Sequence, residues 1–172
     1  MKAEFRIGEL LCRPVCEHDA AAFAAMHSDP AVYLQNGRLV EIDALFSHYL
    51  HAEHAWALEI DGAFAGTAAL SQNSLTAAVK QLNVFELSFS LLPRFWGRGY
   101  ATQAVRAVCS HAFSALGADA VIAGAFADNA RSHALLDRVG FGTVLFSRPA
   151  KDLSGCERQE QLRLLVKLKE SA

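Results

Sequence analysis

The sequence predicts a mixed α/β or α+β fold in which strands and helices alternate along the chain. Residues 85–91 alternate between apolar and polar side chains without a fault, as a strand with one buried face does. Residues 98–116 carry apolar side chains at helical spacing and stop at Gly117. A chain of 172 residues, of which 52% are hydrophobic, suits one domain with a sizeable core. We therefore expect residues 1–172 to form a single domain.

The chain should begin with a strand followed by two helices. Residues 10–15 favour a strand, and residues 18–27 favour a helix. That helix should stop before Pro30, because proline lacks a backbone donor and cannot continue a helix. Residues 41–52 carry four large apolar side chains at helical spacing and predict the second helix.

A β-hairpin and the clearest strand of the sequence follow. Residues 55–60 and 63–70 are joined by Asp61-Gly62, a pair that tolerates the positive φ angles of a type I′ turn. After a polar turn near residues 72–80, the strand at 85–91 should place its apolar side chains on one face. These side chains are Phe85, Leu87, Phe89 and Leu91.

The last third of the chain continues this alternation. After the helix over residues 98–116, a short apolar run at 120–126 predicts a buried strand and residues 129–139 predict a helix. Residues 141–146 and 161–168 predict two closing strands. The resulting order of strands and helices implies a mixed sheet with parallel pairing around the central helix.

The composition argues against several classes of partner. A net charge of −2 and a pI near 6.4 give no reason to expect binding to nucleic acid or to an anionic membrane. Residues 1–6 lack the apolar run of a signal peptide, and no apolar stretch approaches the length of a membrane span. The four cysteines form no Cys-x-x-Cys pair and are expected to be reduced thiols. We expect a soluble, cytoplasmic protein.

The charges are distributed unevenly along the chain. Residues 1–60 hold nine acids and four bases, whereas residues 87–118 hold no acid and include Arg94, Arg98 and Arg106. The middle of the chain therefore suits a polyanion. The acidic N-terminal part is either a solvated surface or a region that attracts an amine, and the sequence leaves both interpretations open.

Residues 94–101, Arg-Phe-Trp-Gly-Arg-Gly-Tyr-Ala, lie between the alternating strand and the central helix. The first turn of a helix leaves about four backbone N–H groups unpaired and carries partial positive charge, so an anion can bind there. Gly97 and Gly99 would let a phosphate approach the main chain, although a plain turn would also use two glycines. The Rossmann fingerprint lacks its third glycine, because Thr102 stands in its place, and the Walker loop does not occur in the chain.

The glycine loop and two further segments resemble a known family. Arg94-x-x-Gly97-x-Gly99, after a strand and before a helix, resembles the acetyl-CoA signature of the GNAT N-acetyltransferase superfamily. The wider string at residues 91–102 resembles the RimJ/RimL-like branch, which acetylates N-termini of ribosomal proteins and other amines. Residues 10–14 resemble the opening strand of that branch, and residues 129–141 resemble its last helix.

The resemblance implies a fold, a co-substrate and a set of binding residues. The fold is a mostly antiparallel sheet of about seven strands with about four helices, splayed between the fourth and fifth strands. The co-substrate is acetyl-CoA, held by backbone groups of residues 89–92 and 95–101 and, at its thiol end, by Asn129 and Ser132. The implied donor-binding residues are Phe89, Ser90, Leu91, Leu92, Arg94, Phe95, Trp96, Gly97, Arg98, Gly99, Tyr100, Ala101, Asn129 and Ser132.

Transfer of acetyl to an amine requires a neutral nucleophile, donors for the developing oxyanion and a leaving thiolate. The resemblance implies that the N–H of Phe89 or Ser90 is the oxyanion donor. Glu86 is the candidate base, because it is the only acid in the strand at 85–91. Three residues of strand span roughly 10 Å, so Glu86 would act through water or would bind a cationic acceptor. The alternative is a polar residue on a solvent-facing strand side.

The proton for the leaving thiolate has a less obvious source. Many members of the superfamily carry a tyrosine in the last helix where Leu136 stands in this sequence. Ser132, the second candidate catalytic residue, would donate a hydrogen bond to the sulfur or would bond its own backbone instead. Because a thiol has a pKa of about 8.5, its thiolate leaves tolerably near neutral pH without a strong acid.

The first hypothesis for the function is an N-acetyltransferase that acetylates a primary amine by direct attack in a ternary complex. The acceptor would be a protein N-terminus or a small amine. The alternative is a non-catalytic acyl-CoA-binding or sensing module, and a nucleotide-binding oxidoreductase ranks below both. No metal site is predicted, because the histidines lack cysteine partners and a His-Glu-x-x-His pattern. Phe146 and the last strand are candidates for a homodimer contact.

Overall fold

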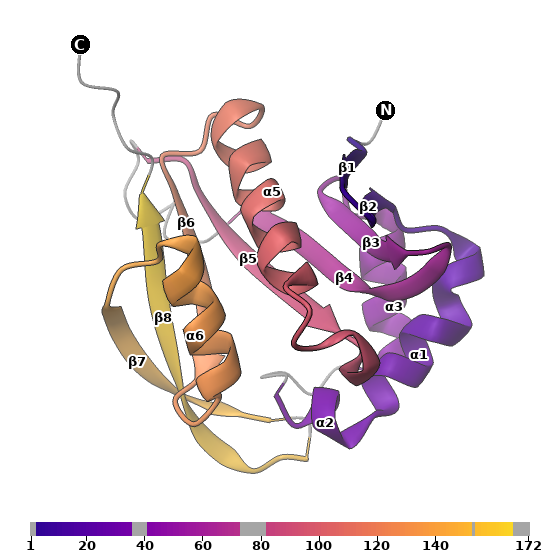
Figure 1. The fold of residues 1–172 in the computed structure, drawn as a ribbon. Helices are drawn as coiled ribbons and strands as arrows, with labels where there is room; N and C mark the ends of the chain where they lie inside the picture. The colour runs from indigo at the N-terminus through magenta and orange to yellow at the C-terminus, as the bar shows by residue number, and fades with distance from the viewer. Residues whose placement is uncertain (1–2, 36–40, 73–81, 153, 167–172) are drawn as a thin grey trace.

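The computed structural model describes residues 3–35, 41–72, 82–152 and 154–166, and in these residues the strands form one mixed sheet (Figure 1). The strands are β1 (Phe5–Ile7), β2 (Leu10–Pro14), β3 (Ala55–Ile60), β4 (Ala63–Gln72), β5 (Val84–Leu91), β6 (Ala120–Phe126), β7 (Val144–Lys151) and β8 (Glu157–Val166). The helices are α1 (Ala20–Ser28), α2 (Pro30–Tyr33), α3 (Ile42–His51), α5 (Tyr100–Ser114) and α6 (Ala130–Val139). Two 3₁₀ turns, η1 (Glu17–Asp19) and η2 (Pro93–Phe95), precede α1 and α5.

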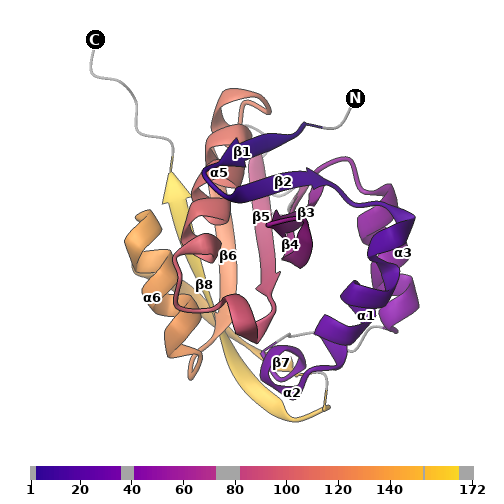
Figure 2. The same cartoon turned by 45° about the vertical axis from the view of Figure 1, so that its right-hand side comes forward.

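The sheet has the order β1-β2-β3-β4-β5-β6-β8-β7, and its neighbours are antiparallel except for the parallel pair β5 and β6. The α5 crossover joins this pair, as the predicted parallel pairing around the central helix requires. Helices α5 and α6 cover one face of the sheet, and α1 and α3 cover the other (Figures 1 and 2). The predicted mixed fold is therefore confirmed.

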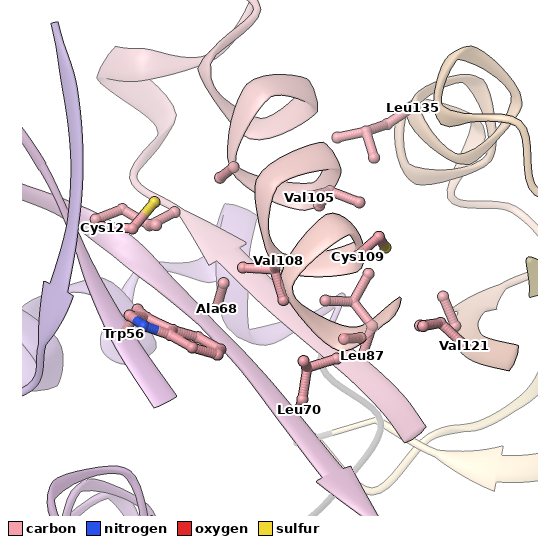
Figure 3. Close-up of a cluster of buried hydrophobic side chains, with 14 of the residues drawn as sticks. Cys12, Trp56, Ala68, Leu70, Leu87, Val105, Val108, Cys109, Val121 and Leu135 are labelled. Atoms are coloured by element: carbon pink, nitrogen blue, oxygen red, sulfur yellow. The ribbon is translucent and has the colours of Figure 1, made fainter. Parts of the chain in front are cut away.

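The largest core cluster lies between α5 and the sheet (Figure 3). Val105 and Val108 of α5 are buried there, together with Ala68 of β4 and Leu87 of β5. Leu135 of α6 joins the same cluster. The apolar side of β5, predicted from its alternation, faces α5. Consequently the polar side of β5 faces α1 and α3.

The parallel pairing of β5 and β6 ends before either strand does. Their register runs from Val84 opposite Ala120 to Leu87 opposite Ala123, although β5 continues to Leu91 and β6 to Phe126. The predicted splay between the fourth and fifth predicted strands is thus confirmed. It opens a gap in the sheet that joins the α5 face to the α3 face.

The turns follow the predicted backbone chemistry. Asp61 and Gly62 have φ angles of 51° and 76°, as a type I′ turn requires. Helix α1 ends at Ser28, and Pro30 begins the short helix α2. The Asp29 side chain caps α2 by accepting a hydrogen bond from the Ala31 N–H at 2.9 Å.

Some predicted element bounds were wrong. The sheet of the described residues has eight strands where about seven were predicted, because residues 5–7 pair with β2. The strands predicted at 141–146 and 161–168 lie at Val144–Lys151 and Glu157–Val166. These strands form a hairpin at the sheet edge, in which the apolar residues 144–146 are exposed while the charged residues Arg148, Glu160 and Arg163 are half-buried or buried in ion pairs, so apolar alternation marks the strands poorly. Residues 167–168 and the polar turn at residues 73–80 lie outside the described residues.

The helices carry no membrane-spanning character. In the part of the chain that the structure describes, none is both long enough and apolar enough to cross a bilayer.

The central helix begins at Tyr100 instead of the predicted residue 98, because Gly97 and Gly99 both have positive φ angles and lie outside the right-handed helical region.

Candidate functional site

A cleft of about 1030 Å³ lies where β5 and β6 separate. Its walls come from both faces of the sheet, because residues of α5 and α6 line it together with residues of α1 and α3. The sheet gap connects these two sides. One ligand can therefore enter from the α5 side and a second from the α3 side, and the two can meet between the strands.

Most of the implied donor-binding residues line this cleft. They are Phe89, Ser90, Leu91, Phe95, Trp96, Gly97, Gly99, Tyr100, Ala101, Asn129 and Ser132. Leu92, Arg94 and Arg98 are not among the lining residues, and the Arg94 guanidinium lies 4.9 Å from the centroid of the Phe95 ring. The role assigned to these three residues stays a prediction.

The glycine loop presents backbone to the cleft. Gly97 and Gly99 have φ angles of 76° and 81°, a left-handed conformation that side chains rarely adopt. A Cβ atom added at Gly97 would meet no heavy atom within 4 Å, so the space beside it is open. Helix α5 starts directly after Gly99, and its first N–H groups lack partners within the helix. The loop thus offers an open, positively polarised cradle for an anion.

Trp96 and Arg131 connect the two sides of the sheet gap. The Trp96 Nε1–H donates to the carbonyl oxygen of Leu91 at 2.7 Å, at the end of β5. The Arg131 guanidinium of α6 lies 3.9 Å from the centroid of the Trp96 ring. Both residues line the cleft. Arg131 was missed in the sequence, because no local pattern shows that it faces residue 96.

The backbone of β5 directs polar groups into the gap. The Leu92 N–H donates to the Ala65 carbonyl oxygen of the neighbouring strand at 2.8 Å. Because backbone groups alternate in direction along a strand, those of Phe89 and Leu91 point away from β4 and towards β6. The register with β6 has ended at Leu87, so the Phe89 N–H faces the cleft.

Polar side chains gather on the α3 side of β5. Glu86, Ser88 and Ser90 alternate with the apolar residues of β5 and line the cleft. The Tyr49 hydroxyl of α3 and the Ser88 Oγ lie 3.1 Å apart. Burial raises the pKa of Tyr49, so its phenol stays protonated and can donate a hydrogen bond. The contact joins residues 39 positions apart, and no local pattern predicts it.

Glu160 of β8 brings a second carboxylate to the same side. A Cβ atom added at Gly124 would collide with this carboxylate. Glu160 therefore lies against β6 just beyond Ala123, the last β6 residue that pairs with β5. The Arg148 Nε donates to Glu160 Oε2 at 2.7 Å. Among the described residues that line the cleft, the acids are Glu86 and Glu160. Both lie on the side away from α5.

The start of α6 holds the residues assigned to the thiol end of the donor. The Asn129 Oδ1 accepts a hydrogen bond from the Ser132 N–H at 3.1 Å and so caps the helix. Leu136, at the position where many superfamily members carry tyrosine, is fully buried. The side chain of Ser132 lines the cleft, and its role towards sulfur stays a prediction.

His27 of α1 contributes a buried imidazole to the cleft wall. Its side chain is 4% exposed, and its ring centroid lies 4.4 Å from that of Phe23. Burial lowers the pKa of His27 to about 4. The imidazole is therefore neutral at neutral pH. Among the described residues, no group of three or more His, Cys, Asp or Glu side chains could hold a metal ion.

We expect His27 to destabilise the protein in mild acid. Because the pKa of His27 in the folded state lies below its ordinary value, protonation favours the unfolded chain, and stability falls as the pH decreases from about 6.5 towards 4. Between pH 7 and pH 5 the loss should be about 2 kcal/mol. Denaturant unfolding at both pH values should show about 2 kcal/mol less loss in His27→Gln. Equal losses in both proteins would exclude His27 as the source.

Comparisons with known proteins bear on the family and on the fold. A family model described as an acetyltransferase (GNAT) domain matches residues 9–142. The uncharacterised N-acetyltransferase YoaA of Bacillus subtilis is 38% identical over 56 residues. That match covers 33% of this chain and 32% of YoaA, so it spans about a third of the relative's length.

Solved structures share the fold at low sequence identity. The yncA acetyltransferase of Salmonella typhimurium, solved with its cofactor acetyl-CoA, has a TM-score of 0.72 at 20% identity and covers 95% of this chain and 96% of its own. RimJ of Mycobacterium smegmatis, in complex with CoA-disulfide, has a TM-score of 0.74 at 19% identity and covers 95% of this chain and 86% of its own. At these identities the likeness concerns the fold.

Proposed function

Because this chain belongs to the GNAT acetyltransferase family, whose model matches residues 9–142, we propose that it is an acetyl-CoA-dependent N-acetyltransferase. The observation that carries the proposal is the gap between β5 and β6. It is bordered on the α5 side by the glycine loop and on the α3 side by Tyr49, Ser88 and two carboxylates. An anionic donor and an amine acceptor suit these two sides.

The residues of the chain fit the donor. The open space at Gly97 and the N–H groups at the start of α5 would hold the pyrophosphate, and the β5 backbone at Phe89 and Leu91 would hold the pantetheine. Bound there, acetyl-CoA supplies an activated acetyl thioester and a thiol leaving group. Its acetyl end would lie in the gap, within reach of an amine from the α3 side.

The α3 side would deliver the amine in its neutral form. Glu86, acting through water, would accept the proton that a primary ammonium group must lose before its nitrogen can form the new C–N bond. The Phe89 N–H would stabilise the negative charge that develops on the carbonyl oxygen as the C–N bond forms, and this charge would be lost again when the carbonyl re-forms and the C–S bond breaks. Ser132 would donate a hydrogen bond to the departing sulfur. Tyr49 would hold Ser88 in place at the acceptor edge.

The acceptor is the finer part of the proposal. The likeness to RimJ supports a RimJ/RimL-like enzyme, and we propose a protein N-terminal α-amine or a small primary amine as acceptor. We also propose one domain over residues 1–172 and a cytoplasmic location, where free thiols such as those of Cys16 and Cys156 persist. Self-association through Phe146 and the last strand stays a prediction.

Two measurements test this function. Acetyl-CoA should raise the melting temperature of the protein, and a panel of primary amines should include some that release CoA thiol from acetyl-CoA in its presence. Stabilisation without thiol release for any amine would favour the alternative, a non-catalytic acyl-CoA-binding or sensing module. Stabilisation by NAD(P)H, with none by acetyl-CoA, would instead favour a nucleotide-binding oxidoreductase.

A further inference from the structure

The exposed arginines of α6 form a row beside the glycine loop. Arg131, Leu135 and Arg138 follow one another at spacings of four and three residues, so they share one face of the helix. All three line the cleft. Both arginine side chains are exposed, whereas the neighbouring acid Asp137 is paired with Arg163 of β8.

The row lies along the groove between α5 and α6. Because β5 and β6 are parallel and each leads into one of these helices, α5 and α6 begin at the same end of the sheet, and they lie side by side (Figure 1). Arg131 stands at that end, where its guanidinium stacks on Trp96 next to Gly97. Arg138 lies seven residues further on, about 10 Å along the helix.

Arg106 of α5 lies at the far end of the groove. Its Nη2 donates to the carbonyl oxygen of Arg138 at 2.6 Å, which brings a third guanidinium to the level of Arg138. The acids among the described lining residues, Glu86 and Glu160, lie on the α3 side of the sheet. On the α5 side, guanidinium groups therefore lie at two levels along α6: a first level at Arg131 and a second level at Arg138. Among the described residues that line the cleft, no carboxylate lies on this side.

A pyrophosphate bound at the glycine loop would lie near Arg131, at the first level, but would not extend to Arg138 at the second. CoA carries a further phosphate monoester on the ribose next to its pyrophosphate, and this 3′-phosphate bears nearly two negative charges near neutral pH. Guanidinium groups bind such a group through charge-assisted hydrogen bonds. The second level of cations matches this additional charge.

We propose that Arg138 binds the 3′-phosphate of the donor and that Arg131 pairs with its pyrophosphate, so that the site selects CoA thioesters over their 3′-dephospho forms. The inference rests on the proposed function, because it assumes that the cleft takes a CoA thioester. It makes Arg138 of α6 a specificity-determining residue. Arg138 and Arg131 would bind the donor and take no part in the acetyl transfer.

Calorimetric titration with CoA and with 3′-dephospho-CoA tests the proposal. The wild-type protein should bind CoA about tenfold more tightly than 3′-dephospho-CoA, because one charge-assisted contact is worth about that factor. Arg138→Ala should lose this preference by weakening CoA binding alone. Arg131→Ala should weaken the binding of both ligands. Arg6→Ala, which removes an exposed arginine of β1, should change neither affinity.

Two controls separate binding from folding. Arg138→Lys keeps the charge and should retain most of the preference, and each variant should melt within a few degrees of the wild-type protein. Equal affinity of the wild-type protein for the two ligands, or equal weakening of both by Arg138→Ala in a folded variant, would overturn the assignment of Arg138. If the wild-type protein binds neither ligand, the proposed function fails first.

Discussion

Gly97→Trp is expected to bind acetyl-CoA at least about 100-fold more weakly than the wild-type protein, because two or more charge-assisted contacts to the pyrophosphate would be lost. A side chain at this position would enter the open space beside the loop, where no heavy atom lies within 4 Å of an added Cβ. The indole would then occupy the volume that the phosphates need. Calorimetric titration with acetyl-CoA measures the loss directly.

Gly117→Trp provides the matched control. Gly117 has a φ angle of 64°, and an added Cβ there also meets no heavy atom within 4 Å, but the residue does not line the cleft. Both variants therefore carry the backbone strain of a left-handed side chain, about 1 to 2 kcal/mol, and only one blocks the loop. Gly117→Trp should bind acetyl-CoA as the wild-type protein does. If Gly97→Trp also did so, the loop would have no part in binding the donor.

Glu86→Gln is expected to lower kcat about 100-fold and to leave the dissociation constant of acetyl-CoA unchanged. A general base contributes on the order of 100-fold or more to such a reaction, and the amide cannot accept the proton. Glu86 lies three residues before Phe89 on β5, which is roughly 10 Å along the strand. It would therefore act on an amine near the Phe89 N–H through water. Steady-state kinetics with the best amine, combined with titration of acetyl-CoA, separates the two effects.

Glu160→Gln distinguishes the two carboxylates of the cleft. Because the Glu160 carboxylate is already paired with Arg148, we expect it to position the amine instead of accepting its proton, so its loss should raise the KM for the amine more than it lowers kcat. Glu157→Gln, an exposed acid at the start of β8, serves as control and should alter neither constant. A 100-fold loss of kcat in Glu160→Gln with an active Glu86→Gln would move the proton acceptor to Glu160.

The sequence allowed residues to be proposed for the donor side of the site, whereas most of those on the acceptor side could be named only from the structure. Most of the donor-binding residues belong to one continuous segment, from β5 through the glycine loop into α5, and local rules govern such a segment. The predictions for residues 141–168 were less accurate. Their hairpin lies at the sheet edge, where paired charges such as Arg148 and Glu160 replace the apolar alternation that marks a buried strand.

The acceptor side is assembled from distant parts of the chain. Tyr49 meets Ser88 across 39 residues, and Glu160 lies against Gly124 of a neighbouring strand. Glu86 could be proposed from the sequence because it shares a strand with the donor site. Tyr49 and Glu160 could not, because their own surroundings in the sequence resemble those of any helix or edge strand.

By itself the sequence determined the strand alternation of β5, the turn at Asp61-Gly62 and the glycine loop before α5. These features depend on side-chain periodicity and on the backbone freedom of single residues, which are local properties. Only the tertiary structure decided which side chains meet at the sheet gap and that Arg131 stacks on Trp96 there. Packing of α3 and α6 against the sheet and pairing of β8 with β6 set those contacts. Spacing along the chain does not encode the distances between elements that are far apart in it.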